Sequence, residues 1–350
     1  MEEKTAPAEP IKNTEKPKLM DRIRQNLVWI IFAMLAWYIF VCGILHMICA
    51  DIAGQFLGDL SASMRFTLKS YAITIIDILG LFLICQCFRK NRYIWKSFRL
   101  PGRSAKPGHN RLFSQDDIDA ELYGRSRNGF RMLGIGLLLG FLTNFFCILC
   151  ALIHGDIKLY FETSLSQLPY FIFSLLCVCI QSSSEELWCR GFLYERLHER
   201  YPLWVAIAVN GALFGLLHVF NPGASAIPII GIMVCGVSYS LLRWYTGNIW
   251  IAMGIHTGWN FTQNFIFGLP NSGLVSETSV FHLDAATGIS SLIYDWDFGV
   301  EGGLPALFID ALLGVLIIVL AVRSGRIREL GMNRRQTEEA TGLLNAEITK

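Results

Sequence analysis

Long apolar runs separated by short polar segments dominate the chain. A helix that crosses the hydrocarbon core of a bilayer needs about 20 mainly apolar residues, and eight stretches approach that length. The pattern therefore predicts an all-α polytopic membrane helix bundle of about eight transmembrane helices. Small residues recur in the later stretches, as expected where helices approach closely. The predicted spans are 27–50, 70–88, 130–153, 168–189, 203–220, 226–243, 248–267 and 304–322.

The distribution of positive charge predicts the orientation of these spans. Lys and Arg residues concentrate on the cytosolic side of membrane proteins. Of the 30 in this chain, six lie before the first span, ten in the 89–129 loop and six after the last span. The loops expected outside hold only Arg65, Lys69 and Lys158. We therefore expect both termini in the cytosol.

Composition supports the membrane assignment and limits the partners. The chain is 53% hydrophobic and 17% charged, whereas soluble domains carry about 25% charged residues. Its basic residues flank apolar spans and form no basic domain, so we expect the lipid bilayer and no nucleic acid as a partner. Residues 1–26 are predicted to be a disordered cytosolic tail, 27–322 the membrane domain and 323–350 a second cytosolic tail. The oligomeric state stays open.

Three of the spans contain pairs of residues spaced four apart, and each pair includes a Glu, Arg or His. Such polar residues are costly in hydrocarbon and usually have a partner or a function. Residues four apart lie on one face of a helix, so each pair presents its side chains together. They are Glu185 with Glu186-x-x-x-Arg190 in the fourth span, Phe214-x-x-x-His218 in the fifth and His256-x-x-x-Asn260 in the seventh.

Counting residues from the cytosolic turns places these pairs at similar depth. Glu185 lies about 16 residues before the turn at 201–202 and His218 about 16 after it, roughly 24 Å along each helix. His256 and Asn260 lie roughly 14 and 20 Å from the next cytosolic turn. The pairs share one layer if the polar stretch 190–200 projects beyond the membrane. The sequence does not determine whether they are neighbours in that layer.

The first pair combines a structural and a chemical role. Glu186 and Arg190 form an acid–base pair, and two charges inside a helix bundle are tolerated when they neutralise each other. Glu185 points about 100° away and has no cation on its own helix. An unpaired buried carboxylate suits a general base, so we expect Glu185 to activate water.

The other two pairs supply groups that such a base requires. His218 can share a water with Glu185, and Phe214 can pack on its imidazole and restrict its rotamers. His256 and Asn260 can donate hydrogen bonds to a developing oxyanion. We therefore expect a hydrolase without a cofactor.

Alternatives remain at this point. Glu and His also bind zinc, so a zinc-dependent hydrolase is one alternative, although no His-Glu-x-x-His motif is present. A non-catalytic membrane scaffold, or a ligand-binding or transport protein, is another. The outer loop 268–303 is long for a connector and could cover the site.

The three motifs together resemble those of the CPBP family of intramembrane glutamic endopeptidases, which includes CAAX prenyl endopeptidases and bacteriocin-processing enzymes. The resemblance extends over about residues 165–305. It also includes the sequences around 217–222, 256–261, 268–270 and 299–303.

The resemblance implies that Glu185 and His218 activate water, that His256 and Asn260 form the oxyanion site, and that the fold has eight spans. It implies a peptide or a membrane-anchored protein segment as substrate without identifying it. The motif flanks are similar to bacterial members, which favours a bacterial plasma membrane, with the endoplasmic reticulum as the alternative.

Overall fold

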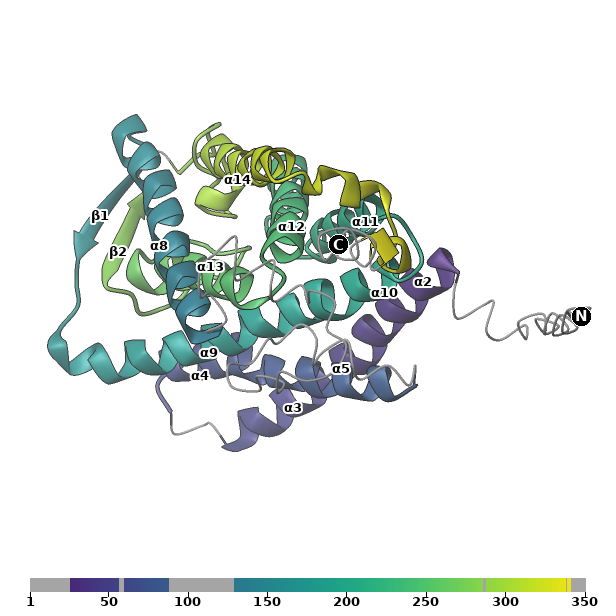
Figure 1. Ribbon diagram of the computed structural model, residues 1–350. Helices are drawn as coiled ribbons and strands as arrows, with labels where there is room; N and C mark the ends of the chain where they lie inside the picture. Colours follow the sequence, from purple (N-terminus) through teal and green to yellow (C-terminus); the bar gives the residue numbers. More distant parts are fainter. Residues whose placement is uncertain (1–25, 57–59, 88–128, 286–287, 338, 341–350) are drawn as a thin grey trace, which may run out of the picture.

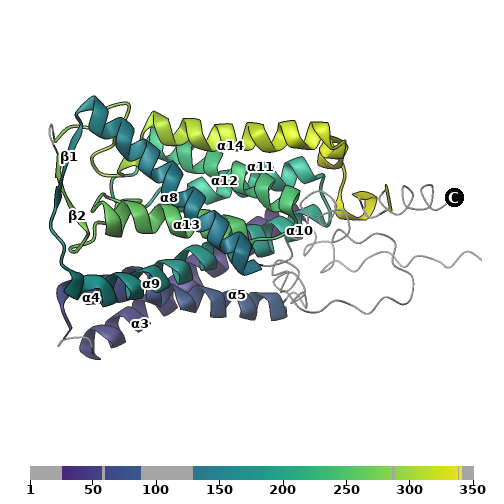
Figure 2. The same ribbon diagram turned by 60° about the vertical axis from the view of Figure 1, so that its left-hand side comes forward.

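The protein is a bundle of packed helices (Figure 1), most of which run roughly lengthwise in the view of Figure 2. The computed structural model describes residues 26–56, 60–87, 129–285, 288–337 and 339–340. The predicted tail 1–26, apart from Asn26, and the 89–129 loop, apart from Gly129, lie outside these residues. The helices are α2 (Leu27–Ala36), α3 (Gly43–Phe56), α4 (Ala62–Ser70), α5 (Ile75–Cys87), α8 (Gly129–His154), α9 (Leu168–Glu186), α10 (Tyr194–His198), α11 (Leu203–Leu217), α12 (Ala226–Thr246), α13 (Trp250–Phe261) and α14 (Leu304–Arg323).

Short π- and 3₁₀-helical segments join several of these helices into longer ones. The π segments are η1 (Trp37–Cys42), η4 (Leu187–Leu193) and η5 (Thr262–Ile266), and the 3₁₀ segments are η2 (Ala72–Thr74), η3 (Leu165–Gln167), η6 (Val300–Gly302) and η7 (Arg326–Gly331). Within the described residues, six helical runs are long and apolar enough to cross a membrane: 31–49, 62–86, 129–154, 165–198, 226–246 and 304–323. Large apolar side chains such as Phe32, Leu138 and Phe308 are exposed on the outer surface. The predicted class, a polytopic helical membrane bundle, is confirmed.

The other two predicted spans correspond to shorter helices. The stretch 203–220 contains α11, of 15 residues, and 248–267 contains α13, of 12 residues, which continues into η5. The number of membrane crossings and the orientation therefore stay predictions. Two boundaries also differ from the prediction. The helical run that corresponds to the second predicted span begins earlier, with α4, and the run that corresponds to the fourth continues to His198.

The polar stretch 190–200 is packed against other parts of the protein, and its projection beyond the membrane stays a prediction. Glu195, Arg196 and His198 of α10 are all buried. Part of the predicted C-terminal tail covers this region. The Leu203 N–H donates to the Met332 carbonyl at 2.9 Å, and Arg334 forms an ion pair with Glu195.

Close contact between α8 and α13 fixes the position of the third motif. Gly136 and Gly140 on α8 face Gly254 and Gly258 on α13, so the backbones touch. A Cβ atom at Gly140 would lie 2.2 Å from the Ile255 carbonyl oxygen. Small residues four apart allow such an approach in membrane bundles.

A small antiparallel sheet, which the sequence did not indicate, lies at one end of the bundle (Figure 2). Strand β1 (Ile157–Phe161) pairs with β2 (Phe281–Ala285), with Leu159 opposite Leu283. Because β2 belongs to the segment 268–303, the sheet attaches this long loop to the loop before α9. The sheet thereby anchors the loop at this end of the bundle.

Candidate active site

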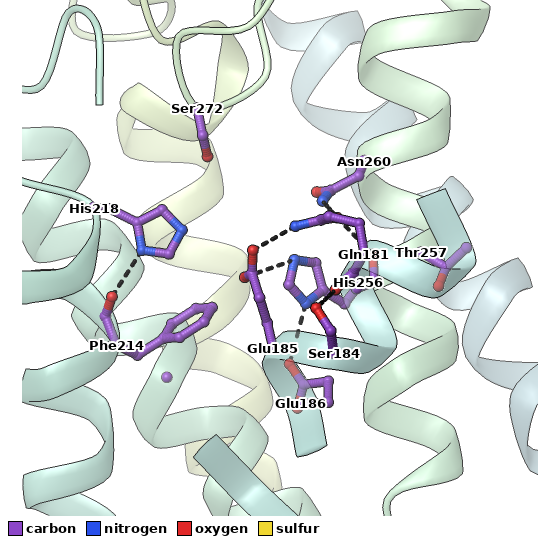
Figure 3. Close-up of polar contacts among 12 residues, drawn as sticks. Gln181, Ser184, Glu185, Glu186, Phe214, His218, His256, Thr257, Asn260 and Ser272 are labelled. Atoms are coloured by element: carbon purple, nitrogen blue, oxygen red, sulfur yellow. Dashed lines mark hydrogen bonds and ion pairs between the residues drawn. The ribbon is translucent and has the colours of Figure 1, made fainter. Parts of the chain in front are cut away.

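The structure brings all three motifs to one cavity of about 200 Å³. Glu185 comes from α9, His218 from the end of α11, and His256 and Asn260 from α13. Figure 3 shows these side chains directed toward a common centre. The prediction that the motifs share one layer is therefore correct, and they are also neighbours within it. Gln181, Phe214, Asn221, Asn271, Ser272 and Leu274 also line the cavity.

Glu186 and Arg190 form the ion pair that their spacing predicts. Arg190 donates to Glu186 Oε1 at 3.0 Å, and both side chains are completely buried. The pair lies where α9 changes into the π segment η4, a feature that often marks functional sites. Arg190 also donates to the Gly236 carbonyl of α12 at 3.4 Å, so the pair joins two helices.

Phe214 connects the ion pair to both imidazoles. Its ring lies 4.2 Å from the Arg190 guanidinium carbon, a cation–π contact, and 4.9 Å from the His218 ring. The His256 ring is 6.1 Å away. The expected packing of Phe214 on His218 is confirmed.

The tautomer of His218 follows from its contact with the backbone. Its Nδ1 lies 2.8 Å from the Phe214 carbonyl oxygen. A carbonyl only accepts hydrogen bonds, so Nδ1 carries the proton and, in the neutral ring, Nε2 is an acceptor. Nε2 lies on the side of the ring that faces the centre of the site (Figure 3).

His256 lies between the two adjacent carboxylates. Its Nδ1 is 3.1 Å from Glu186 Oε1 and its Nε2 is 3.8 Å from Glu185 Oε2. Two expectations change as a result. Glu186 orients His256 in addition to pairing with Arg190, and Glu185 has a nearby imidazole from another helix although it has no cation on its own.

Gln181 is a site residue that the sequence interpretation missed. It lies one helical turn before Glu185, donates to Glu185 Oε1 and accepts from the Asn260 amide at 3.1 Å. It therefore links the candidate base to one candidate oxyanion donor. The signal was present as Gln181-x-x-x-Glu185, the same spacing as in the three motifs.

The outer loop covers the site with polar groups of its own. Asn271 and Ser272 line the cavity, and the Ser272 N–H donates to Glu301. Glu301 also lines a smaller cavity of about 50 Å³ beside His256. Burial raises the pKa of the Glu301 carboxyl to about 7, while hydrogen bonds from Ser272 oppose the rise. Asp310 of α14 also lines this smaller cavity.

The described part of the chain contains no cluster of side chains that could form the alternative zinc site. No group of three or more His, Cys, Asp or Glu side chains there is arranged to hold a metal ion. The cysteines that the structure describes are free thiols.

Comparisons with known proteins identify the class of the site-bearing segment. Residues 164–262 match the sequence model of a family described as type II CAAX prenyl endopeptidase Rce1-like. This stretch includes all seven motif residues. The segment is therefore similar to this family, and the resemblance found in the sequence is confirmed.

One curated relative extends the comparison. Over 92 residues the chain is 35% identical to the uncharacterized protein YyaK of Bacillus subtilis (strain 168). This aligned stretch covers 25% of this chain and 30% of that protein. The chain thus spans less than a third of the relative that it matches. No solved structure gives a significant match.

Proposed function

We propose that the protein is an intramembrane endopeptidase that hydrolyses a peptide bond in a membrane-associated peptide or protein. One observation carries the proposal. Glu185 Oε2 has no hydrogen-bond partner among the described residues, and its side chain lines a cavity together with His218, His256 and Asn260. A carboxylate oxygen without a hydrogen-bond partner among these residues, beside two imidazoles, is an arrangement suited to water activation.

In the proposed reaction, Glu185 and His218 bind one water between them. Glu185 takes a proton as the water oxygen attacks the carbonyl carbon of the substrate, and His218 Nε2 accepts the second hydrogen bond and orients the oxygen. Glu185 then returns the proton to the leaving amine as the C–N bond breaks. Gln181 keeps the Glu185 carboxylate in place through its hydrogen bond to Oε1.

The oxyanion forms on the side of Asn260 and His256. The Asn260 amide has two N–H donors, and one of them is used by Gln181, so the second is available to the oxyanion. His256 Nδ1 is used by Glu186. His256 therefore donates from Nε2 only when both ring nitrogens carry protons.

The family match supports a prenylated protein tail, or another peptide held at the membrane, as the substrate class. The bacterial character of the motif flanks and the Bacillus subtilis relative support a bacterial plasma membrane as the location. Exposed apolar side chains around the bundle support a position of the site within a membrane, where such a substrate would be enriched.

The test is cleavage by the full-length protein in detergent and in liposomes. The substrates are internally quenched peptides, one set ending in a farnesylated CAAX tail and one set unprenylated and of random sequence. Glu185→Gln keeps the shape of the side chain but removes proton acceptance, so turnover should fall roughly 10²–10⁴-fold.

Glu277→Gln is the matched control, because Glu277 is exposed in the outer loop, and it should retain the wild-type rate. Near-full activity of Glu185→Gln would eliminate the assignment of the base. If the wild-type protein cleaved no peptide, a non-catalytic role at the membrane would replace the proposal.

A further inference from the structure

A tight turn of the outer loop presents polar groups to the cavity from the side opposite Glu185. The turn comprises residues 271–274 and is closed by two hydrogen bonds between Asn271 and Leu274, of 2.8 and 2.9 Å. Its central residues, Ser272 and Gly273, have φ values of 48° and 85°, as in type I′ turns. Among the described residues, Ser272 is the one non-glycine residue with positive φ.

This turn is fixed from several directions. The Ser272 N–H donates to Glu301, and its carbonyl accepts from the Asn221 amide at 3.2 Å. Asn264 donates to the Leu274 carbonyl at 2.8 Å. A non-glycine residue in the left-handed region costs on the order of 1 kcal/mol, and such strain persists where the surrounding structure imposes it. The surroundings thus hold a serine where glycine would be easier to accommodate.

The Asn271 side chain is a buried donor without a partner. Its exposed fraction is 4%, it lines the cavity, and its Nδ2 makes no hydrogen bond with any of the described residues. A buried polar group in that condition costs about 1–3 kcal/mol. In a binding site, a ligand that accepts this hydrogen bond offsets that cost in free energy.

Ser272, the next residue, also lines the cavity. Figure 3 shows its side chain extending from the loop toward the space between His218 and Asn260. The Ser272 side chain hydrogen-bonds to the Glu301 carboxyl, and its oxygen can still accept a hydrogen bond from an N–H group.

We propose that the turn 271–274 is a substrate-binding element, in which Asn271 Nδ2 donates to a main-chain carbonyl of the bound peptide and the Ser272 hydroxyl contacts a neighbouring main-chain amide group. The inference rests on the proposed function in that the ligand is a peptide lying over Glu185. Contacts to the main chain would hold substrates in place without selecting a particular side chain.

Three variants test the turn by separating chemistry from backbone conformation. Asn271→Ala removes the donor. Ser272→Gly removes the hydroxyl but is compatible with positive φ, whereas Ser272→Ala removes the hydroxyl and keeps the strain. The matched control is Ser276→Ala, because Ser276 bonds within the loop to Thr278 and does not line the cavity.

Two measurements make failure of this inference distinguishable from failure of the proposed function. The first is steady-state cleavage of a quenched farnesylated CAAX-tail peptide. The second is fluorescence anisotropy of the labelled peptide, farnesylated and unprenylated, on Glu185→Gln protein that carries each variant. A lost hydrogen bond should raise KM and Kd about 3- to 10-fold, with kcat changed less than about twofold.

Ser272→Gly and Ser272→Ala should weaken binding equally, while the glycine variant keeps or raises the thermal midpoint. The Ser276→Ala control should bind as the parent does. Equal dissociation constants for all variants, no saturable binding of either peptide, or weakened binding in Ser272→Ala alone would overturn the proposal.

Discussion

The buried pair of Glu186 and Arg190 gives the sharpest prediction about stability. Arg190→Ala removes the 3.0 Å ion pair, the bond to the Gly236 carbonyl and the cation–π contact with Phe214. It leaves the Glu186 carboxylate buried without its cation. Breaking a fully buried pair in this way costs about 3–5 kcal/mol.

The expected cost lies near the lower end of that range. Glu186 Oε1 keeps its contact with His256 Nδ1 at 3.1 Å, and His256 supplies a compensating charge when it is protonated. About 3 kcal/mol corresponds to a fall of roughly 6–12 °C in the unfolding midpoint of a large domain. Activity should fall as well, because Phe214 and His256 both lose a neighbour that fixes them.

The assay is thermal unfolding of the full-length protein in detergent, followed by tryptophan fluorescence. Arg335→Ala is the matched control, since Arg335 and Glu339 have the same spacing at 2.7 Å but are exposed. Exposed pairs contribute little, so the control midpoint should not change. The double variant Glu186→Gln with Arg190→Met removes both charges and should regain most of the lost stability. A stable but inactive Arg190→Ala would refute this reasoning and indicate that Arg190 contacts substrate.

The remaining predictions concern the site and its cover. Asn260→Ala should lower kcat roughly 10²–10³-fold with little change in KM, measured by steady-state kinetics; a raised KM with unchanged kcat would make Asn260 a substrate-binding residue. EDTA should not inhibit cleavage, and inhibition that Zn²⁺ reverses would favour the zinc-dependent alternative. The pKa of Glu301 rises from 4.5 to about 7, so its contribution to stability is full below 4.5 and is lost as pH rises through 7. That loss is at most about 3 kcal/mol. Glu301→Gln stays neutral and keeps an acceptor for Ser272, so its thermal midpoint should fall less than that of wild type over this pH range, and identical profiles would contradict the assignment.

Local contacts at the site were predictable from sequence. The Glu186–Arg190 ion pair and the packing of Phe214 on His218 join residues four apart on one helix, and helix geometry alone brings such residues together. The helical membrane bundle was equally predictable, because a bilayer requires long apolar helices. Counting residues from the cytosolic turns, with the helical rise per residue, also predicted that the motifs lie at similar depth.

Contacts between elements were decided by the tertiary structure. Gln181 meets Asn260 across 79 positions of the chain, and His256 meets Glu186 across 70. These contacts depend on which helix faces align, which the glycine contact between α8 and α13 sets. The cover supplied by Asn271, Ser272 and Glu301 depends on loop packing and on the small sheet. The sequence by itself thus determined which side chains share a helix face, because that follows from the helical repeat. Only the fold determined which faces meet, because local spacing can indicate a face suited to close packing but does not identify the segment that packs against it.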